Sequence, residues 1–159
     1  MDKIIALLTT SDGRIGRQQW WIGVLAIFVV ALVAGLVLNL LAFGNFTILS
    51  WLYVLLNLAL LWPTYNLGMK RRHDRDNDGT DLKIFLGASV LLNLLAATGI
   101  GFSMVDMGGG LMLPQPPFWL TALNLLFGIF AIYMLVQLGF LKGTTGSNTF
   151  GADPVGAAA

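Results

Sequence analysis

The sequence predicts an all-α membrane protein whose four transmembrane helices form two antiparallel hairpins. Hydrophobic residues make up 57% of the chain and charged residues only 11%, whereas soluble domains carry about 25% charged residues. Glutamate is absent, although helices that face water use it freely. The apolar residues gather in four runs, and each is near the ~20 residues that a helix needs to cross the hydrocarbon core.

The four predicted spans cover residues 20–43, 48–67, 82–103 and 118–140. A segment in lipid must satisfy its own backbone hydrogen bonds, so each span is expected to be helical. Only the short link 44–47 separates the first two spans, which predicts a tightly connected helix pair. The length of the chain leaves room for a single integral membrane domain over residues 1–159.

Basic residues predict the orientation of the spans. All nine Lys and Arg residues fall on one side of the membrane if the spans alternate in direction. Cytoplasmic loops carry an excess of these residues. The N-terminus, the loop 68–81 and the tail 141–159 are therefore expected in the cytoplasm. The five Trp residues lie near the predicted span ends, where aromatic rings prefer the headgroup level.

Proline, glycine and asparagine residues lead to three local predictions. Pro63 should kink the second span or end it early. The outer link 104–117 holds three glycines in a row and three prolines, which predicts an irregular loop. Three mid-span amides are expected to hydrogen-bond between helices: Asn57, Asn93 and Asn124.

The segment 70–83, KRRHDRDNDGTDLK, holds more than half of the charged side chains and the only histidine. Asp74, Asp76 and Asp78, followed by a glycine, match the opening of a calcium-binding loop. A complete loop requires a bidentate Glu at its twelfth position, where this chain has Phe85. A single histidine in a chain without cysteine also supplies too few of the usual ligands for a transition-metal site. The sequence therefore favours a solvated turn over a calcium site, and no cofactor is expected.

His73 and Asp74 are adjacent and provide an acid–base pair. Such a pair needs a nucleophile in reach for catalysis, and the spacing supplies none, so no catalytic residue is assigned. The spans also lack ionisable residues at mid-membrane depth, where ion-coupled transporters usually need one. The alternative function is that of a small membrane enzyme or transporter that uses His73 and Asp74.

Six residues are expected to form a cytoplasmic cluster with a binding role: Arg14, Arg17, Arg71, Arg72, His73 and Asp74. Arg14 and Arg17 lie three apart, so on a helix they would share one face, from which they could pair with Asp74 or Asp76. Bases beside an anionic leaflet attract headgroups at roughly 1 kcal/mol each. The expected partners are the lipid bilayer with its anionic headgroups, a second copy of the chain or another membrane protein. Nucleic acid is not expected, because four acids interrupt the basic segment.

Three motifs follow one another along the chain: residues 13–21 (GRIGRQQWW), 70–79 (KRRHDRDNDG) and 143–154 (GTTGSNTFGADP). In this order and around four spans, the chain resembles the DUF805 family (domain of unknown function 805), YhaH-like proteins of the bacterial inner membrane. The resemblance implies a multi-pass protein of that membrane and brings no established activity. Thr80 stands where the family has Trp, and Arg72 stands where relatives often have Leu or Cys.

The third motif, in the tail, is rich in residues that favour turns. We expect the tail to fold back against Arg14 and His73, with Phe150 as an apolar anchor. The sequence thus predicts an integral inner-membrane protein with a structural, partner-binding or lipid-binding role that the cytoplasmic Arg/His/Asp cluster carries. It favours a function other than catalysis.

Overall fold

A computed structural model describes residues 2–155, and residues 156–159 of the predicted tail lie outside this described part. Its elements are α1 (Asp2–Thr9), α2 (Arg17–Leu41), α3 (Phe46–His73), α4 (Thr80–Thr98), β1 (Ser103–Asp106), β2 (Met112–Gln115), α5 (Phe118–Leu135) and the π-helical turn η1 (Val136–Phe140). As the sequence predicts, four helices are long and apolar enough to cross a membrane: α2, α3, α4, and α5 continued by η1.

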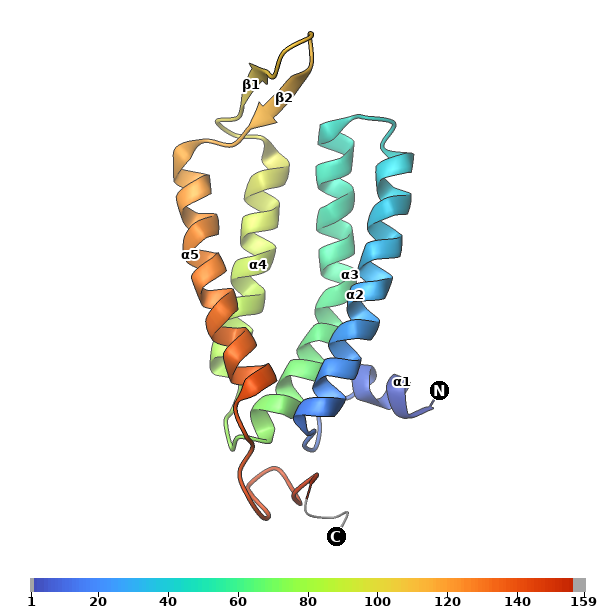
Figure 1. Ribbon diagram of the computed structural model, residues 1–159, viewed down its shortest axis with the longest axis vertical. Coiled ribbons are helices and arrows are strands. Elements are labelled where there is room, and N and C mark those ends of the chain that lie inside the picture. Colours follow the sequence, from blue (N-terminus) through green and yellow to red (C-terminus); the bar gives the residue numbers. More distant parts are fainter. Residues whose placement is uncertain (1, 156–159) are drawn as a thin grey trace.

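The long helices run roughly alongside one another, and α3 packs against both α2 and α4 (Figure 1). The link between α2 and α3 lies at the same end as the two strands. The opposite end holds α1, the turn 74–79 between α3 and α4, and the segment 141–155 that follows η1 (Figure 1). We call this second end the basic end, because the Lys and Arg residues of the chain belong to the segments that meet there.

The third helix is longer than the predicted span, which ended at residue 67. It passes through Pro63 and continues to His73, so the turn that follows covers only residues 74–79 instead of the predicted 68–81. Packing holds this extension in place, because Leu67 is buried and Gly68 lies directly against Leu82 of α4. Tertiary contacts of this kind outweigh the one hydrogen bond that a proline removes from a helix.

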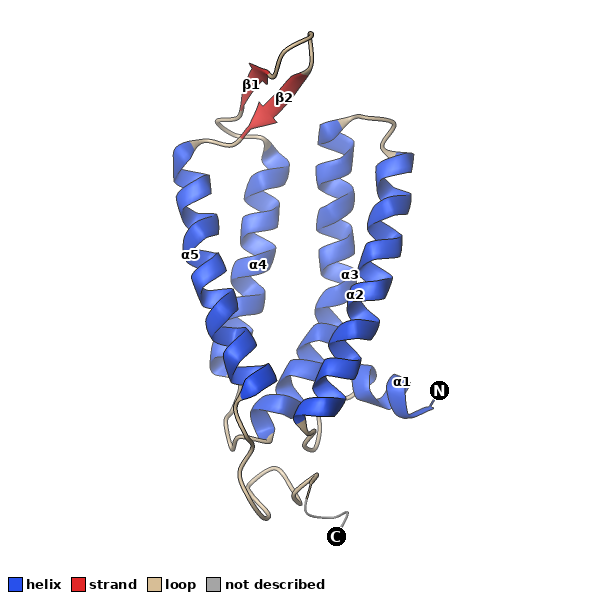
Figure 2. Cartoon of the chain, in the orientation of Figure 1, coloured by secondary structure: helices blue, strands red, loops and turns tan. Residues whose placement is uncertain are grey.

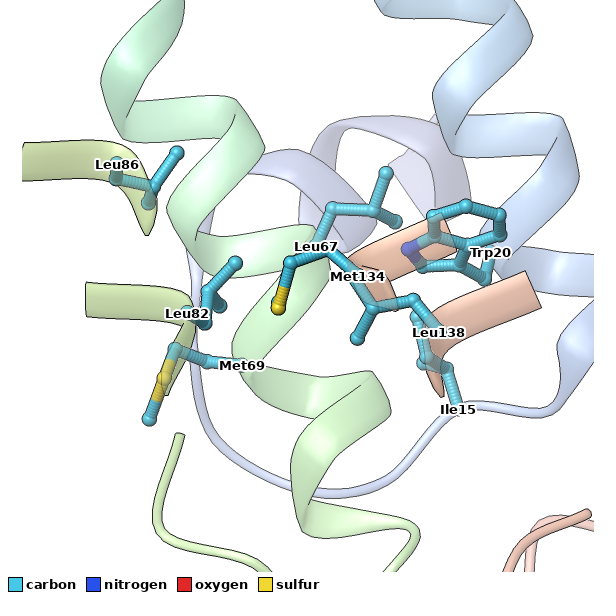
Figure 3. Close-up of a cluster of buried hydrophobic side chains, with 8 residues drawn as sticks. All are labelled: Ile15, Trp20, Leu67, Met69, Leu82, Leu86, Met134 and Leu138. Atoms are coloured by element: carbon cyan, nitrogen blue, oxygen red, sulfur yellow. The ribbon is translucent and has the colours of Figure 1, made fainter. Parts of the chain in front are cut away.

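A cluster of buried apolar side chains fills the bundle toward the basic end (Figure 3). Its members are Ile15, Trp20, Leu67, Met69, Leu82, Leu86, Met134 and Leu138. Away from this cluster the long helices expose many large apolar side chains. A protein in water rarely exposes contiguous apolar surface on this scale, whereas lipid accepts it.

The outer link contains a β-hairpin, and the prediction of an irregular loop there was wrong. Strands β1 and β2 pair antiparallel, with Met104 opposite Pro114 (Figure 2). The glycines Gly108–Gly110 all have positive φ and form the turn that the hairpin needs. A two-stranded sheet has two free edges, so Pro114 is tolerated although it lacks a donor.

The helix α1 was not predicted, and it lies across the basic end beside α3 (Figure 1). Lys70 Nζ donates to the carbonyls of Ala6 at 2.6 Å and Leu7 at 3.3 Å. Asn66 Nδ2 donates to the carbonyl of Leu8 at 3.1 Å. These side chains satisfy carbonyls that the end of a helix leaves open, so α3 fixes the short helix in place.

The asparagine prediction also needs correction. Asn93 and Asn124 donate to carbonyls of their own helices, four residues earlier, rather than to a neighbouring helix. Asn57 has a buried side-chain oxygen without a hydrogen bond. An amide that joins two helices is Asn39 of α2, which donates to the hydroxyl of Tyr53 of α3 at 2.8 Å.

Candidate functional site

The carboxylate of Asp74 lies buried between two arginines at the end of α3. Arg14 Nη2 is 3.0 Å from Oδ1, and Arg71 Nη1 contacts Oδ2. The side chains of Arg14, Arg71 and Asp74 are only 1%, 0% and 5% exposed. We call these three residues the arginine–aspartate network. Because burying an ion is costly unless it is paired and hydrogen-bonded, the remaining guanidinium N–H groups need acceptors as well.

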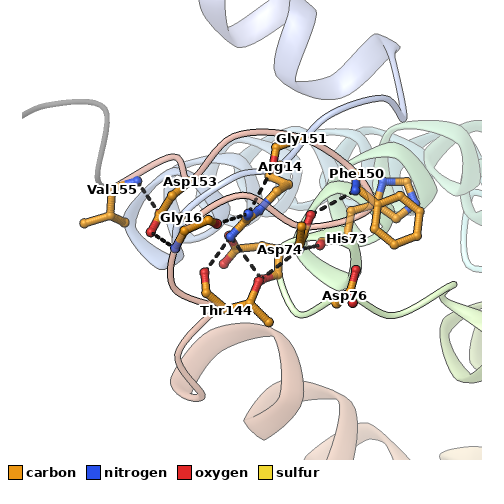
Figure 4. A network of polar contacts seen from close by, with 12 residues as sticks. Arg14, Gly16, His73, Asp74, Asp76, Thr144, Phe150, Gly151, Asp153 and Val155 are labelled. Atoms are coloured by element: carbon orange, nitrogen blue, oxygen red, sulfur yellow. Dashed lines mark hydrogen bonds and ion pairs between the residues drawn. The ribbon is translucent and has the colours of Figure 1, made fainter.

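Arg14 finds those acceptors on the tail (Figure 4). Its Nη1 donates to the carbonyl of Gly146 at 2.7 Å and to that of Gly151 at 3.1 Å. Its Nη2 donates to the carbonyl of Thr144 at 2.7 Å. One side chain from the segment before α2 therefore joins the end of α3 to three points on the tail.

The tail also contacts the end of α3 directly, as the sequence predicts. The backbone N–H of Thr144 donates to the carbonyl of Asp74 at 2.8 Å. Asn148 Nδ2 donates to the carbonyl of His73 at 2.8 Å. The ring of Phe150 stacks on the imidazole of His73 (Figure 4). The tail is thus folded back against Arg14 and His73.

A second set of contacts lies at the end of the last helix. Five consecutive carbonyls, from Gln137 to Leu141, accept N–H groups from side chains of earlier segments, and we call them the carbonyl row. Their donors are, in order, Arg75 at 3.4 Å, Arg71 at 2.7 Å, Trp21 at 3.2 Å, Arg17 at 3.1 Å and again Arg71. The last carbonyls of a helix have no partner within it and carry partial negative charge. Three arginines therefore complement this helix end both by hydrogen bonding and by charge.

Comparison with known proteins identifies one family that covers most of the chain. The model of the family described as "Protein of unknown function (DUF805)" matches residues 8–152. The chain belongs to the DUF805 family. It is 32% identical to the uncharacterized protein YiiR of Escherichia coli (strain K12) over 147 residues, which is 92% of this chain and 86% of YiiR. The YiiR protein of Escherichia coli O157:H7 matches to the same extent. No solved structure matches the chain.

In this DUF805 protein the arginine–aspartate network brings the three sequence motifs together. Arg14 comes from the first motif, Arg71 and Asp74 from the second, and the acceptor carbonyls from the third. Gly143 opens the third motif, and a Cβ atom at this position would collide with the Asp74 carboxylate. The spacing of the motifs along the chain therefore reflects one contact region at the basic end.

Three of the six residues predicted for the cluster are not members of the network: His73, which stacks on Phe150, and Arg17 and Arg72. Arg72 donates to Asp81 of α4 at 2.5 Å and to the side chain of Gln137 at 3.1 Å. Arg17 is the first residue of α2 and donates to the carbonyl of Phe140. The prediction that Arg14 and Arg17 share a helix face was wrong, because Arg14 lies before α2, whose N-cap is Gly16 in an extended conformation.

The three aspartates of the calcium-loop half-motif do not converge. Both oxygens of Asp74 accept from arginines, and Asp76 Oδ1 accepts from the backbone N–H of Thr149. The hydroxyl and the backbone N–H of Thr80 donate to Asp78, and these bonds lower the pKa of its carboxyl. Within residues 2–155 there is no group of three His, Cys, Asp or Glu residues placed to hold a metal ion.

Gln137 and Thr144 are central to these contacts, although no sequence pattern predicted a role for either. The side-chain oxygen of Gln137 accepts from Arg72 and Arg75. Thr144 accepts from Arg14 and donates to Asp74 through both its N–H and its hydroxyl. The sequence offered one indication for Gln137, namely that it is a polar residue near the end of an apolar span. Thr144 belonged to a motif that was recognised as a whole but not residue by residue.

Proposed function

We propose that this DUF805 protein is a multi-pass protein of the bacterial inner membrane with a structural and surface-binding role. Its four spans form two antiparallel hairpins, and the basic end faces the cytoplasm. The positive-inside rule supports this orientation. The Lys and Arg residues belong to segments at the basic end, whereas the links at the opposite end contain one charged residue, Asp106. The Arg/His/Asp cluster holds the tail against the bundle, so that a fixed basic surface faces lipid headgroups or a membrane partner.

The structural role rests on one observation: the buried charged side chains bind other parts of the same chain. Arg14 joins the segment before α2, the end of α3 and the tail through one 1% exposed guanidinium group. A catalytic acid or base needs a free group that can reach a substrate. Both oxygens of Asp74 already accept from arginines, and His73 is stacked on Phe150. These contacts favour a structural role for the cluster over the enzyme or transporter alternative.

Substitution of Arg14 tests this role. Arg14→Ala should lower the amount of protein in the membrane and expose the tail to protease, because the Asp74 carboxylate and three tail carbonyls lose a donor. The matched control is Lys83→Ala, which removes an exposed base of α4 whose side chain makes no hydrogen bond or ion pair with residues 2–155. A tail that stays protected in Arg14→Ala at normal abundance would contradict the structural role.

His73→Ala separates the structural role from the alternative. A variant that folds at normal abundance and still abolishes a growth phenotype of the wild-type gene would favour an enzyme or transporter. Lower abundance alone would support the structural role.

Topology is tested with a reporter that is active only in the periplasm. Fused after Val155 it should be inactive, and inserted at Gly109 in the outer hairpin it should be active. The reverse pattern would overturn the orientation.

A further inference from the structure

A cavity of about 320 Å³ lies beside the arginine–aspartate network at the basic end. Its lining includes Gly16 and Arg17 at the start of α2, and Lys142 and Thr145 of the segment after η1. We call it the tail cavity. Its volume is at the lower end of the range of small-molecule sites, which suits a headgroup better than a large ligand.

The two acidic side chains at the tail cavity already have hydrogen-bond or ion-pair partners. The carboxylate of Asp74 is paired with two arginines. The carboxylate of Asp153 accepts the backbone N–H groups of Gly146 at 3.0 Å and Val155 at 2.9 Å. Asp153 keeps its negative charge, because backbone N–H groups are neutral, but the three bases in the lining, Arg17, Arg71 and Lys142, outnumber the two acids.

Two basic side chains at the tail cavity keep free donors. Arg17 uses one nitrogen, Nη1, for the carbonyl of Phe140, and the rest of its guanidinium group is open. Lys142 makes no hydrogen bond or ion pair with any residue from 2 to 155. Both residues are exposed. The cavity thus presents two available positive charges with flexible N–H donors, which is the chemistry that binds a phosphate.

Aromatic residues place this cavity at the level of lipid headgroups. Trp21 and Phe140 pack edge to face with 5.9 Å between ring centroids, and both are exposed. They are close in sequence to Arg17 and Lys142, respectively. Amphipathic rings such as Trp prefer the interface between hydrocarbon and water. A lipid phosphate held by the two bases would therefore have its glycerol and acyl chains beside these rings.

We propose that the tail cavity binds the phosphate of an anionic phospholipid of the cytoplasmic leaflet, with Arg17 and Lys142 as its donors. The site rests on the membrane placement given under the proposed function and adds a ligand class and two residues to it. Arg71 of the network also lines the cavity, but its N–H groups are committed to Asp74 and to backbone carbonyls, so it shapes the cavity without serving as a donor.

The experiment measures lipid binding to the purified full chain in a neutral detergent by native mass spectrometry. Phosphatidylglycerol should bind, and phosphatidylcholine with the same acyl chains should bind at least tenfold more weakly. Each base at an anionic surface contributes roughly fivefold in affinity, so the double variant Arg17→Gln with Lys142→Gln should bind phosphatidylglycerol roughly 30-fold more weakly. Arg17→Lys should keep most of the binding, because it keeps the charge.

The matched control is Lys83→Gln, which removes an exposed base at the same end of the molecule outside the tail cavity. An equal loss in Lys83→Gln would overturn the site, because it would show general attraction to the basic end. Inorganic phosphate forms a second arm of the test. If it binds as tightly as phosphatidylglycerol and displaces it, the ligand is a free phosphate and the lipid assignment is overturned.

Two further outcomes separate this inference from the proposed function. Normal folding and the expected reporter topology without phosphatidylglycerol binding would overturn the lipid site alone. Binding that depends on Arg17 and Lys142, combined with a periplasmic tail, would overturn the orientation and the choice of leaflet while the phosphate site stands. Circular dichroism and gel filtration of each variant show whether it is folded.

Discussion

The imidazole of His73 lies flat against the ring of Phe150, with 4.0 Å between the ring centroids and 3° between the ring planes. His73 is the last residue of α3, and Phe150 belongs to the tail. The stack is the apolar counterpart of the hydrogen bonds that Arg14 makes to the same tail. Both contacts hold the tail against the end of α3.

Phe150→Ala should loosen the tail without unfolding the bundle. Stacked aromatic pairs contribute about 0.5–1.5 kcal/mol beyond the area that they bury, so the amides of residues 144–151 should exchange with solvent about two- to tenfold faster. Hydrogen exchange followed by mass spectrometry measures this. Phe43→Ala is the control, because Phe43 is 91% exposed and lies in the link between α2 and α3, at the opposite end of the molecule. Unchanged exchange in Phe150→Ala would show that the stack does not hold the tail.

Two neighbouring aspartates should differ sharply when each is changed to asparagine. Asp74→Asn leaves Arg14 and Arg71 buried without a negative partner, which should cost about 3–5 kcal/mol of stability. Asp76→Asn should change stability by less than about 0.5 kcal/mol, because Asp76 is exposed and an amide oxygen can still accept from Thr149. Asn also tolerates the φ of 54° at this position. Thermal unfolding in detergent compares the two variants, and similar melting temperatures would refute the prediction.

Close packing between α2 and α3 makes Gly23 intolerant of a side chain. A Cβ atom at Gly23 would lie 2.5 Å from Leu67 Cδ1, and Leu67 is buried and cannot move away. Overpacking of this kind costs about 1–3 kcal/mol. Gly87→Ala is the matched control, since no heavy atom lies within 4 Å of its Cβ position. It should be neutral or gain up to about 1 kcal/mol from helix propensity. Equal stability of the two alanine variants would contradict this packing.

The hydrogen bond from Asn39 to Tyr53 should couple α2 to α3. A double-mutant cycle of Asn39→Ala and Tyr53→Phe should give a coupling of about 0.6 kcal/mol, a typical value for such bonds in membranes. Asn93→Ala paired with Tyr53→Phe should give none, because Asn93 donates to Ser89 of its own helix. The free energy of unfolding in mixed micelles measures both cycles. A coupling that is equally small in both cycles would rule out this role for the bond.

The sequence predicts the long helices well because their cause is local. A run of apolar residues of sufficient length is expected to form a helix in lipid whatever lies beside it. Four such helices are present, although α3 ends later and α4 ends earlier than the predicted spans. The β-hairpin was missed because prolines near glycines usually indicate irregular structure. The end of α3 was missed because the close packing of Gly68 against Leu82 of α4 continues the helix beyond residue 67.

The candidate site was predicted in outline and not in detail. Motif order indicated that the tail meets Arg14 and His73, and the acidic residues near the bases indicated ion pairs. The separate placement of Arg72, which contacts Asp81 and Gln137, depends on which side of α3 faces α4. The donors of the carbonyl row depend on how three helices meet, and no pattern along the chain records that geometry.

The carbonyl row has a consequence for the order in which the protein is made. Each of its donors precedes the row in the chain, since Arg17, Trp21, Arg71 and Arg75 all come before Gln137. Chains are synthesised from the N-terminus. These side chains therefore leave the ribosome before the carbonyls that will accept their hydrogen bonds have been made. The last span supplies the acceptors when it arrives, and a chain that stops before η1 leaves three arginines at the basic end without them.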